Sequence, residues 1–173
     1  MKKLNYLAML LIVTILSAFS SASEKWEISK GFSVKFSTEH ASGEFEKISG
    51  TINFDEKDLA NSSFNIQVDV KSIATGNFLK TSHAKGKDWF ESDKYPKITF
   101  VSNKILKSAN GFVVAGNLTM KGITKSIEIP LTFNNNVFSG NFSVNRMDYN
   151  IGSMEGMSKK VGNKINLQIA VPV

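Results

Sequence analysis

The strongest constraint on the fold is an alternation of apolar and polar residues with a period of two. In the segment 32–37, Phe32, Val34 and Phe36 alternate with two serines and a lysine. The same pattern returns in the segments 48–54, 64–70, 112–120, 127–133, 138–144 and 165–171. Successive side chains of a β-strand point to opposite faces, so the pattern predicts strands with one apolar and one polar face. We therefore expect an all-β protein.

Short turn signals separate these strands. Lys121-Gly122 and Asn134-Asn135-Asn136 are of the kind that joins neighbouring antiparallel strands. Antiparallel strands with one apolar face each must stack as a sandwich or close as a barrel. Glycines on the inward face, at Gly50, Gly116 and Gly140, let strands bend or leave space inside, which favours a barrel. The prediction is an antiparallel up-and-down barrel of about eight strands.

The segment 75–96 breaks the alternation and is expected to hold a short helix followed by a loop. Asn77 can cap the first turn of this helix, and Leu79 and His83 lie four residues apart on one face. Gly86 weakens the far end and favours termination there. We expect this insert to cover one end of the barrel.

The first residues have the layout of a secretory signal peptide. Two lysines follow Met1, an apolar run extends from Leu4 to Phe19, and small residues lead to Ala22. The run is shorter than the ~20 residues that span a bilayer, so a membrane anchor is the weaker interpretation. We predict a signal peptide over 1–22, a domain over 23–173, no stable membrane anchor after cleavage, and a periplasmic or secreted location. Cleavage would lower the formal net charge from +6 to +4.

The composition excludes several classes of protein. The chain has no cysteine, which excludes zinc–cysteine clusters, disulfide scaffolds, thiol nucleophiles and lipid attachment through cysteine. Arg146 is the only arginine, and the lysines are spread among acidic residues. This distribution lacks the basic and aromatic patch typical of nucleic-acid binding, so no nucleic-acid partner is expected.

A search for catalytic arrangements finds little. His40 and His83 are the only histidines, and two such ligands leave a zinc shell incomplete. The sequence matches neither a nucleophile elbow, nor a phosphate loop, nor a dinucleotide-binding glycine pattern. We therefore predict no catalytic residue, no metal and no cofactor. An enzyme, the disfavoured alternative, would have to use His40, His83, Asp148 or a tyrosine facing the interior.

The sequence is rich in phenylalanine, with 13 in all, one of them (Phe19) in the predicted signal peptide. Inward-facing phenylalanines can simply pack a solid core. A barrel of about eight strands can instead hold one small ligand. Composition alone does not decide between these interpretations.

Four segments together resemble the bacterial YceI-like family of exported, lipocalin-like lipid-binding proteins. They are His40 to Phe45 followed by Gly50 to Asp55; Ser72 to Asn77 with His83, Asp88-Trp89-Phe90 and Tyr95 to Phe100; Gly116 to Lys125; and Asn145 to Tyr149 followed by Ile151-Gly152. Many members of the family place arginine and aspartate ahead of the helix histidine, where this chain has Lys80-Thr81-Ser82. Lys80 is then the cation of this helix that can reach an anionic group. Its ammonium acts as a point charge and cannot make the paired hydrogen bonds of an arginine guanidinium.

The resemblance implies a lipocalin-like barrel with a long cavity that binds a polyisoprenoid, a quinone-like isoprenoid or a fatty amide without transforming it. For the cavity wall we predict Phe36, Phe45, Phe54, Phe100, Phe112, Leu118, Phe133 and Phe142. For the mouth we predict His40, Phe78, His83, Trp89 and Phe90. Arg146 and Asp148 are interpreted as a structural ion pair rather than a ligand clamp.

A second hypothesis is a filled barrel that acts as an accessory or stress protein through protein contacts, without a ligand. Its markers would be a core without a cavity and an exposed apolar patch. Homodimerisation along an edge strand is left open, because no residue argues for or against it.

Overall fold

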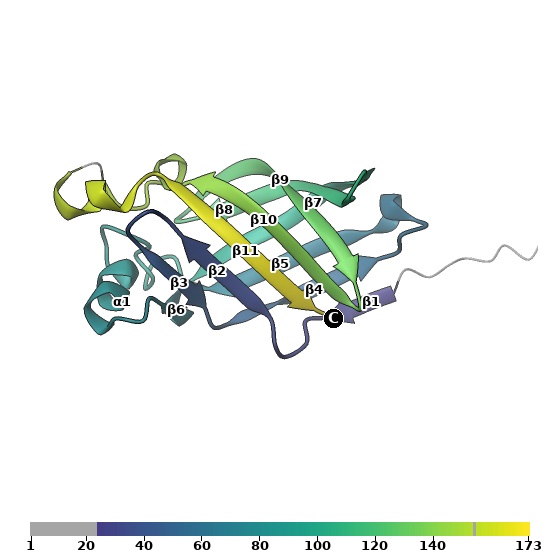
Figure 1. Ribbon diagram of the computed structural model, residues 1–173, viewed down its shortest axis with the longest axis horizontal. Helices are drawn as coiled ribbons and strands as arrows, with labels where there is room; N and C mark the ends of the chain where they lie inside the picture. Colours follow the sequence, from purple (N-terminus) through teal and green to yellow (C-terminus); the bar gives the residue numbers. More distant parts are fainter. Residues whose placement is uncertain (1–23, 154) are drawn as a thin grey trace, which may run out of the picture.

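The computed structural model describes residues 24–153 and 155–173. The predicted signal peptide, residues 1–22, lies outside the described residues. One antiparallel sheet of eleven strands curls around a single interior, and one short α-helix lies at its end (Figure 1). This confirms the prediction of an all-β antiparallel barrel with a short helix near one end.

The strands are β1 (Glu24–Glu27), β2 (Ser33–Ser37), β3 (Ser42–Phe45), β4 (Ile48–Phe54), β5 (Ser63–Asp69), β6 (Ile73–Ala74), β7 (Lys97–Ser108), β8 (Gly111–Met120), β9 (Ile123–Asn134), β10 (Val137–Asn145) and β11 (Lys164–Pro172). The helix is α1 (Phe78–Lys85). Four 3₁₀ turns complete the described secondary structure: η1 (Leu59–Asn61), η2 (Val70–Ser72), η3 (Arg146–Tyr149) and η4 (Gly156–Val161).

The strand number exceeds the predicted one because three long strands are bent. β1 continues into β2, β3 into β4, and β5 through η2 into β6. The first bent strand pairs with the second through β1–β4 and β2–β3, and the second pairs with the third through β4–β5 and β3–β6. Counted with their bends, the eleven segments form about eight long strands, each antiparallel to the next along the chain, as in barrels of this size. β11 finally pairs with β2, with Leu167 opposite Phe36, so the last strand closes onto the first.

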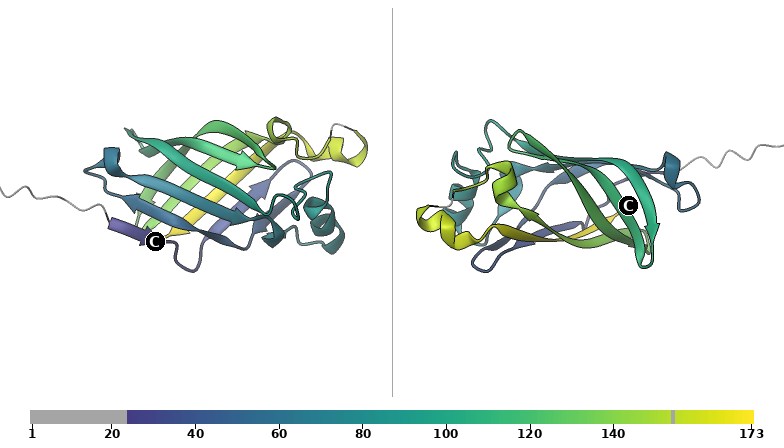
Figure 2. Two further views of the ribbon diagram at one scale, coloured as in Figure 1. Left: turned by 180° about the vertical axis from the view of Figure 1, so that it is seen from behind. Right: turned by 90° about the horizontal axis from the view of Figure 1, so that it is seen from above.

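Turn chemistry places the short connections. Asn135 and Asn136 link β9 to β10, and both have positive φ, 51° and 60°. Lys121 and Gly122 link β8 to β9 with φ values of 48° and 77°. Two successive left-handed residues match the twist of antiparallel strands and fix a tight hairpin. The long connections, 75–96 and 146–163, lie at the opposite end of the barrel from the β9–β10 turn (Figure 2).

Helix α1 begins and ends where the sequence predicts. The side chain of Asn77 accepts a hydrogen bond from the backbone N–H of Lys80 at 3.0 Å, which satisfies one of the free donors of the first turn. Gly86 is the C-terminal cap, and its N–H donates to the carbonyl of His83. No helix in the described part of the chain is long and apolar enough to cross a membrane.

Two glycines of the inward faces are covered by aromatic rings. A Cβ at Gly116 would lie 2.7 Å from the ring of Phe100, and one at Gly43 would lie 2.6 Å from the ring of Phe36. The space that Gly116 releases is thus taken by a side chain of the neighbouring strand β7. The glycine supports packing at this position and adds no room for a guest.

A cluster of aromatic rings fills one end of the barrel, and we call it the aromatic plug. Phe54 lies at its centre, with ring centroids 5.0 Å from both Phe112 and Phe138 and 5.3 Å from Phe133. Phe133 stacks on Phe138 at 4.3 Å. The members are Trp26, Phe54, Phe64, Phe112, Phe133 and Phe138. Edge-on ring pairs at these distances add to the stability that burial supplies.

Candidate functional site

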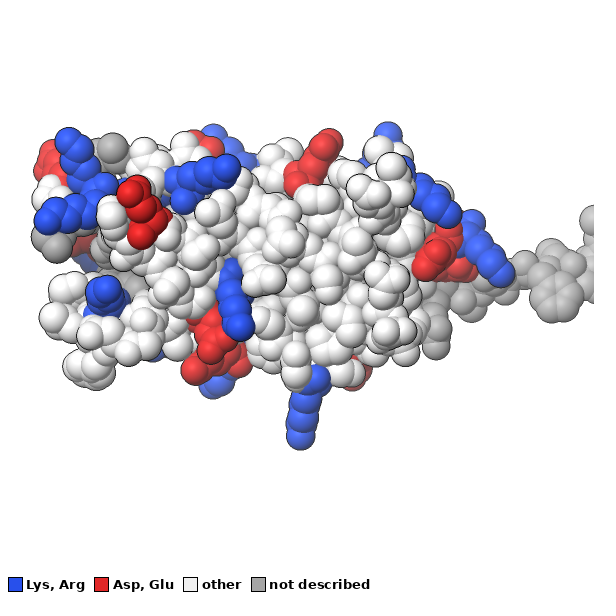
Figure 3. Space-filling model, viewed as in Figure 1, with Lys and Arg blue, Asp and Glu red and all other residues white. Residues whose placement is uncertain are grey.

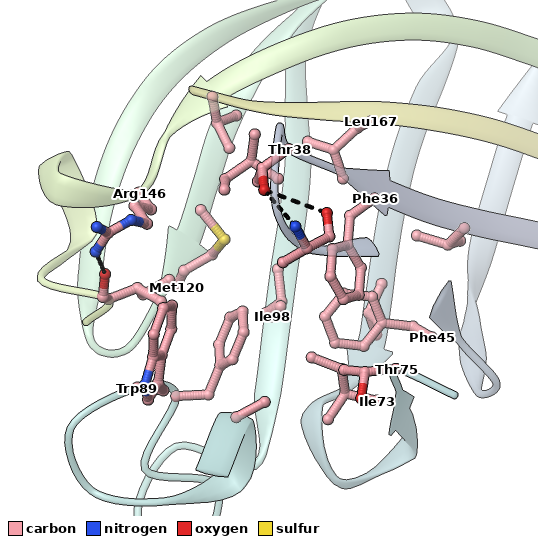
Figure 4. A pocket seen from close by; sticks show the side chains of 18 of the residues that line it. Phe36, Thr38, Phe45, Ile73, Thr75, Trp89, Ile98, Met120, Arg146 and Leu167 are labelled. Atoms are coloured by element: carbon pink, nitrogen blue, oxygen red, sulfur yellow. Dashed lines mark hydrogen bonds between the residues drawn. The ribbon is translucent and has the colours of Figure 1, made fainter. Parts of the chain in front are cut away.

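The other end of the barrel is hollow. A cavity of about 900 Å³ is lined by inward-facing side chains of the strands, by α1, by the loop that follows it, and by residues of the η3–η4 region. Figure 4 shows Phe36 and Phe45 on one side of this cavity, with Trp89 and Arg146 on the other. The lining is predominantly aliphatic and aromatic, and its volume falls within the ~300–1,000 Å³ typical of ligand pockets.

The structure separates the residues predicted for the cavity wall into two groups. Phe36, Phe45, Phe100, Leu118 and Phe142 line the cavity. The other three, Phe54, Phe112 and Phe133, do not line it, and for them the prediction was wrong. All three point inward, but they belong to the aromatic plug, where other rings occupy the space beside them.

The residues predicted for the mouth mostly lie there. His40, His83, Trp89 and Phe90 line the cavity. Phe78 lies on the same helix as His83 but outside the lining, and 89% of its surface is exposed. The structure therefore does not place Phe78 in the cavity lining, because Phe78 begins the helix on a side that faces solvent.

Several lining residues were missed by an emphasis on aromatic side chains. Val34 of β2 and Leu167 and Ile169 of β11 form one side of the cavity. In the ladder between these strands, Val34 lies opposite Ile169 and Phe36 opposite Leu167. Their alternation with polar neighbours, visible in the sequence, marks them as inward-facing residues in the same way as the phenylalanines.

Arg146 is the most deeply buried charged residue of the described chain, with 1% of its surface exposed. Its Nε donates to the carbonyl of Gly162 at 2.6 Å, and Nη1 donates to the carbonyl of Ile151 at 2.7 Å. Nη2 donates to the carbonyls of Ser153 and Ser158 at 3.1 and 3.0 Å. One guanidinium thus joins the first half of the loop between β10 and β11, at Ile151 and Ser153, to its second half, at Ser158 and Gly162.

The predicted ion pair between Arg146 and Asp148 was wrong. Residues two apart on a 3₁₀ turn point in different directions, and here Arg146 is buried whereas Asp148 is exposed. Asp148 instead accepts a hydrogen bond from the side-chain amide of Asn145. Burial lowers the pKa of Arg146, because desolvation disfavours the charged form. Burial also raises the pKa of Tyr149, to which the charge of Asp148 adds.

Two loops meet at the mouth and are fastened to each other. The guanidinium of Arg146 lies 5.4 Å from the ring centre of Trp89, a cation–π contact between the two loops. The N–H of Gly152 donates to the carbonyl of Asp88 at 2.9 Å. Lys121 Nζ donates to the carbonyls of Lys87 and Asn150, both at 3.0 Å. These contacts join the loop after α1 to the loop around η3.

Gly152 lies at the tightest point of this junction. Its φ is +72°, and a Cβ there would lie 2.6 Å from Nη1 of Arg146 and 3.2 Å from the ring of Trp89. Both the backbone conformation and the close approach therefore require glycine. The resemblance in the sequence had singled out Ile151-Gly152, and the structure gives the physical reason for the glycine.

The charged groups of the cavity lining are mostly basic. Lys80, Lys87, Arg146 and Lys160 contribute cations, and Asp88 is the single acid among the lining residues. In the described ranges, 24–153 and 155–173, no group of three or more histidine or acidic side chains is placed to hold a metal ion. This arrangement can take up an apolar chain and attract an anionic or polar head at its rim.

The sequence matches a known family over almost all of the described chain. The profile of the YceI-like domain matches residues 24–173. A UPF0312 protein of Yersinia enterocolitica is 32% identical over 119 residues, which are 63% of this chain and 62% of the relative. The match thus spans less than two thirds of that curated relative.

Two solved structures illustrate the likeness of fold. The crystal structure of BcnA from Burkholderia cenocepacia has a TM-score of 0.75 and 28% identity, covering 81% of this chain and 94% of that one. A polyisoprenoid-binding domain from Saccharophagus degradans has a TM-score of 0.62 over 86% of this chain and 97% of its own. Its identity is 14%, so this likeness concerns the fold alone.

Proposed function

Because this chain belongs to the YceI-like family, we propose that it binds one long-chain amphiphile inside the barrel and carries or sequesters it without chemical change. The observation that carries the proposal is the cavity of about 900 Å³, apolar along its walls and closed at its far end by the aromatic plug. A chain inserted from the mouth would end against Phe64 and Phe138, which belong to both the plug and the cavity lining.

The energetics favour a hydrocarbon chain over a polar ligand. Burying one methylene group contributes about 0.8 kcal/mol, so a chain with ten such groups gains about 8 kcal/mol before ordering costs are subtracted. The walls offer such a chain continuous apolar contact from residues such as Ile66, Phe100 and Leu167. Specificity then depends on chain length and shape, because polar groups gather at the mouth.

Three classes of cargo fit this arrangement: a polyisoprenoid, a quinone-like isoprenoid and a fatty amide. The Saccharophagus degradans domain of the same fold is described as polyisoprenoid-binding, which supports the first class. Lys80 and His83 of α1 both line the mouth, where they would meet the head group. The predicted signal peptide supports action outside the cytoplasm, in the periplasm or after secretion.

The alternative of a filled barrel that acts through protein contacts is less well supported. Its first marker is a core without a cavity, whereas the described residues enclose a hollow of about 900 Å³. Its second marker, an exposed apolar patch, is met among the described residues by Phe78 and Leu79 alone. Unfilled apolar space costs stability, so a protein that keeps such a hollow gains from a guest that occupies it.

The proposal is tested by titrating the mature protein with a long-chain isoprenoid alcohol and a fatty amide, with the heat of binding in a calorimeter as the readout. Leu167→Trp places a larger side chain inside the cavity and should weaken binding by at least about tenfold, through lost burial of one or two methylenes or more. Leu106→Trp makes the same change on the outer face, where Leu106 is 47% exposed, and should leave binding unchanged. Equal affinities for both variants, or no binding by the unaltered protein, would contradict the proposal.

A further inference from the structure

Two large apolar side chains stand in solvent at the start of α1. Phe78 is 89% exposed and Leu79 is 61% exposed, more than any other large hydrophobic residue of the described chain. Val101 and Leu106 follow at 48% and 47%, on the outer face of β7. Single exposed apolar residues are ordinary, but two adjacent ones on one helical turn form a patch that water disfavours.

The patch belongs to the rim of the cavity. Lys80, His83 and Ala84 of α1 line the cavity, whereas Phe78 and Leu79 do not. One side of this short helix therefore borders the opening while its first turn projects the apolar pair outward. Figure 1 shows α1 at the end of the barrel that lies away from the C-terminus.

Cations without acidic partners accompany the patch. Lys80 on α1, Lys87 after it, and Lys159 and Lys160 on η4 have no carboxylate within 4.0 Å in the described ranges. Figure 3 shows basic side chains, with some acidic ones beside them, at the end of the molecule where η4 and α1 lie.

Neighbouring lysines on the outer side of this region are neutralised. Lys71 lies 2.6 Å from Asp93, and Lys94 lies 4.0 Å from Glu91. The pairing lowers the pKa of Asp93 and raises that of Lys71, so both remain charged and the pair has no net charge to offer a partner. Positive charge without an acidic partner is thus present at the opening, where Lys80, Lys87 and Lys160 line the cavity and Asp88 is the single acid of the lining.

We propose that the mouth of the barrel docks reversibly on a membrane surface that contains anionic lipids. Phe78 and Leu79 insert among the acyl chains, and the rim lysines contact the phosphates of the head groups. An exposed apolar pair close to lysines can combine shallow insertion into the bilayer with attraction to anionic lipid.

A protein partner fits these observations less well. A stable protein interface buries about 800 Å² on each side and requires a fitted surface, whereas two projecting side chains offer neither. A lipid surface adapts to whatever enters it. Docking goes beyond the proposed function and would give an insoluble cargo a path from the bilayer to the cavity that avoids water.

Flotation of the mature, ligand-free protein with vesicles tests the proposal. Vesicles of phosphatidylglycerol and phosphatidylethanolamine should retain the protein, and vesicles of phosphatidylcholine alone should retain far less. The double variant Phe78→Ser/Leu79→Ser should bind the anionic vesicles at least about tenfold more weakly, because it removes both inserting groups. The matched control Val101→Ser/Leu106→Ser removes two exposed apolar residues from β7 and should bind normally.

The charge component is tested separately. Lys159→Glu/Lys160→Glu should weaken binding to anionic vesicles by about tenfold or more, since each cation near such a surface contributes about a fivefold factor. Raising the ionic strength should weaken binding of the unaltered protein in the same direction.

Three results would overturn the proposal: equal retention by both vesicle types, equal effects of the α1 and β7 variants, or a dimer that Phe78→Ser/Leu79→Ser converts to monomer without vesicle binding. The last would assign the patch to self-association. Cargo affinity distinguishes these failures from failure of the proposed function, because the α1 variant should bind a water-soluble short-chain isoprenoid as the unaltered protein does.

Discussion

The two ends of the barrel are built from the same alternating strands, yet one is solid and the other hollow. In the aromatic plug, Phe54, Phe64, Phe112 and Phe138 are each 5% exposed or less. Along the cavity, Phe36, Phe142 and Leu167 also face inward but are half-buried, whereas Phe45 and Phe100 are buried. An inward-facing position therefore indicates a core residue at one end and a potential ligand contact at the other.

The connections explain the difference. At the plug, the turns between β7 and β8 and between β9 and β10 are tight, so inward rings from opposite sides can meet. At the mouth, the long segments 75–96 and 146–163 arch over the opening and are held there by Arg146 and its neighbours. Ring packing fills the plug end. At the mouth, hydrogen bonds from Arg146 to backbone carbonyls fix the loops around the cavity instead of side chains filling it.

Truncating a phenylalanine at each end should give the largest contrast. Phe54→Ala removes the central ring of the plug and should lower the free energy of unfolding by about 3–5 kcal/mol. Phe142→Ala removes a ring that already borders the cavity and should cost less than about 2 kcal/mol. Urea titration monitored by circular dichroism measures both. Similar losses at the two positions would mean that the mouth end is packed as tightly as the plug.

Replacing the guanidinium should loosen only the mouth. Arg146→Lys keeps the positive charge but cannot reach the carbonyls of Gly162, Ile151 and Ser158 together, and should cost about 2–3 kcal/mol. Hydrogen exchange should accelerate over 151–162 and stay unchanged over β4 near Phe54. Equally faster exchange at both ends would contradict the conclusion that Arg146 stabilises only the loop 146–163 at the mouth.

A pair of glycine variants should give the smallest of these contrasts. Gly152 and Gly156 both have positive φ, but a Cβ meets Arg146 and Trp89 at Gly152 and nothing within 4 Å at Gly156. Gly156→Ala should cost about 1 kcal/mol through backbone strain alone. Gly152→Ala should cost about 2–3 kcal/mol, because crowding adds to the strain. Thermal unfolding of the two variants measures the difference, and equal costs would show that the contact at Gly152 is easily relieved.

Much of the fold could be predicted from the sequence, because alternation and turn residues are local signals. The strands, the hairpin at Lys121-Gly122 and the helix capped by Asn77 all follow from neighbouring residues. The bends that divide three strands could not be predicted, since they depend on long-range contacts. One example is the Ser72 hydroxyl, which accepts a hydrogen bond from the N–H of Lys47, 25 residues away.

The candidate site was harder to predict, because alternation shows which face a residue is on but not which end of the barrel it occupies. Phe54 ends β4 and Phe112 is the second residue of β8, which places both in the plug once the directions of the antiparallel strands are followed. Phe45, at the end of β3, lies on the cavity instead. The partners of Arg146 were beyond prediction for another reason, because they are backbone carbonyls and leave no mark on the sequence.

The central claim is that the hollow end holds one long-chain guest, and native mass spectrometry of the mature protein, purified from the compartment to which it is exported, tests it most directly. The account predicts a stoichiometric adduct of lipid size that organic extraction releases and that Leu167→Trp diminishes. Bare protein that also fails to take up isoprenoids and fatty amides when they are supplied would contradict it.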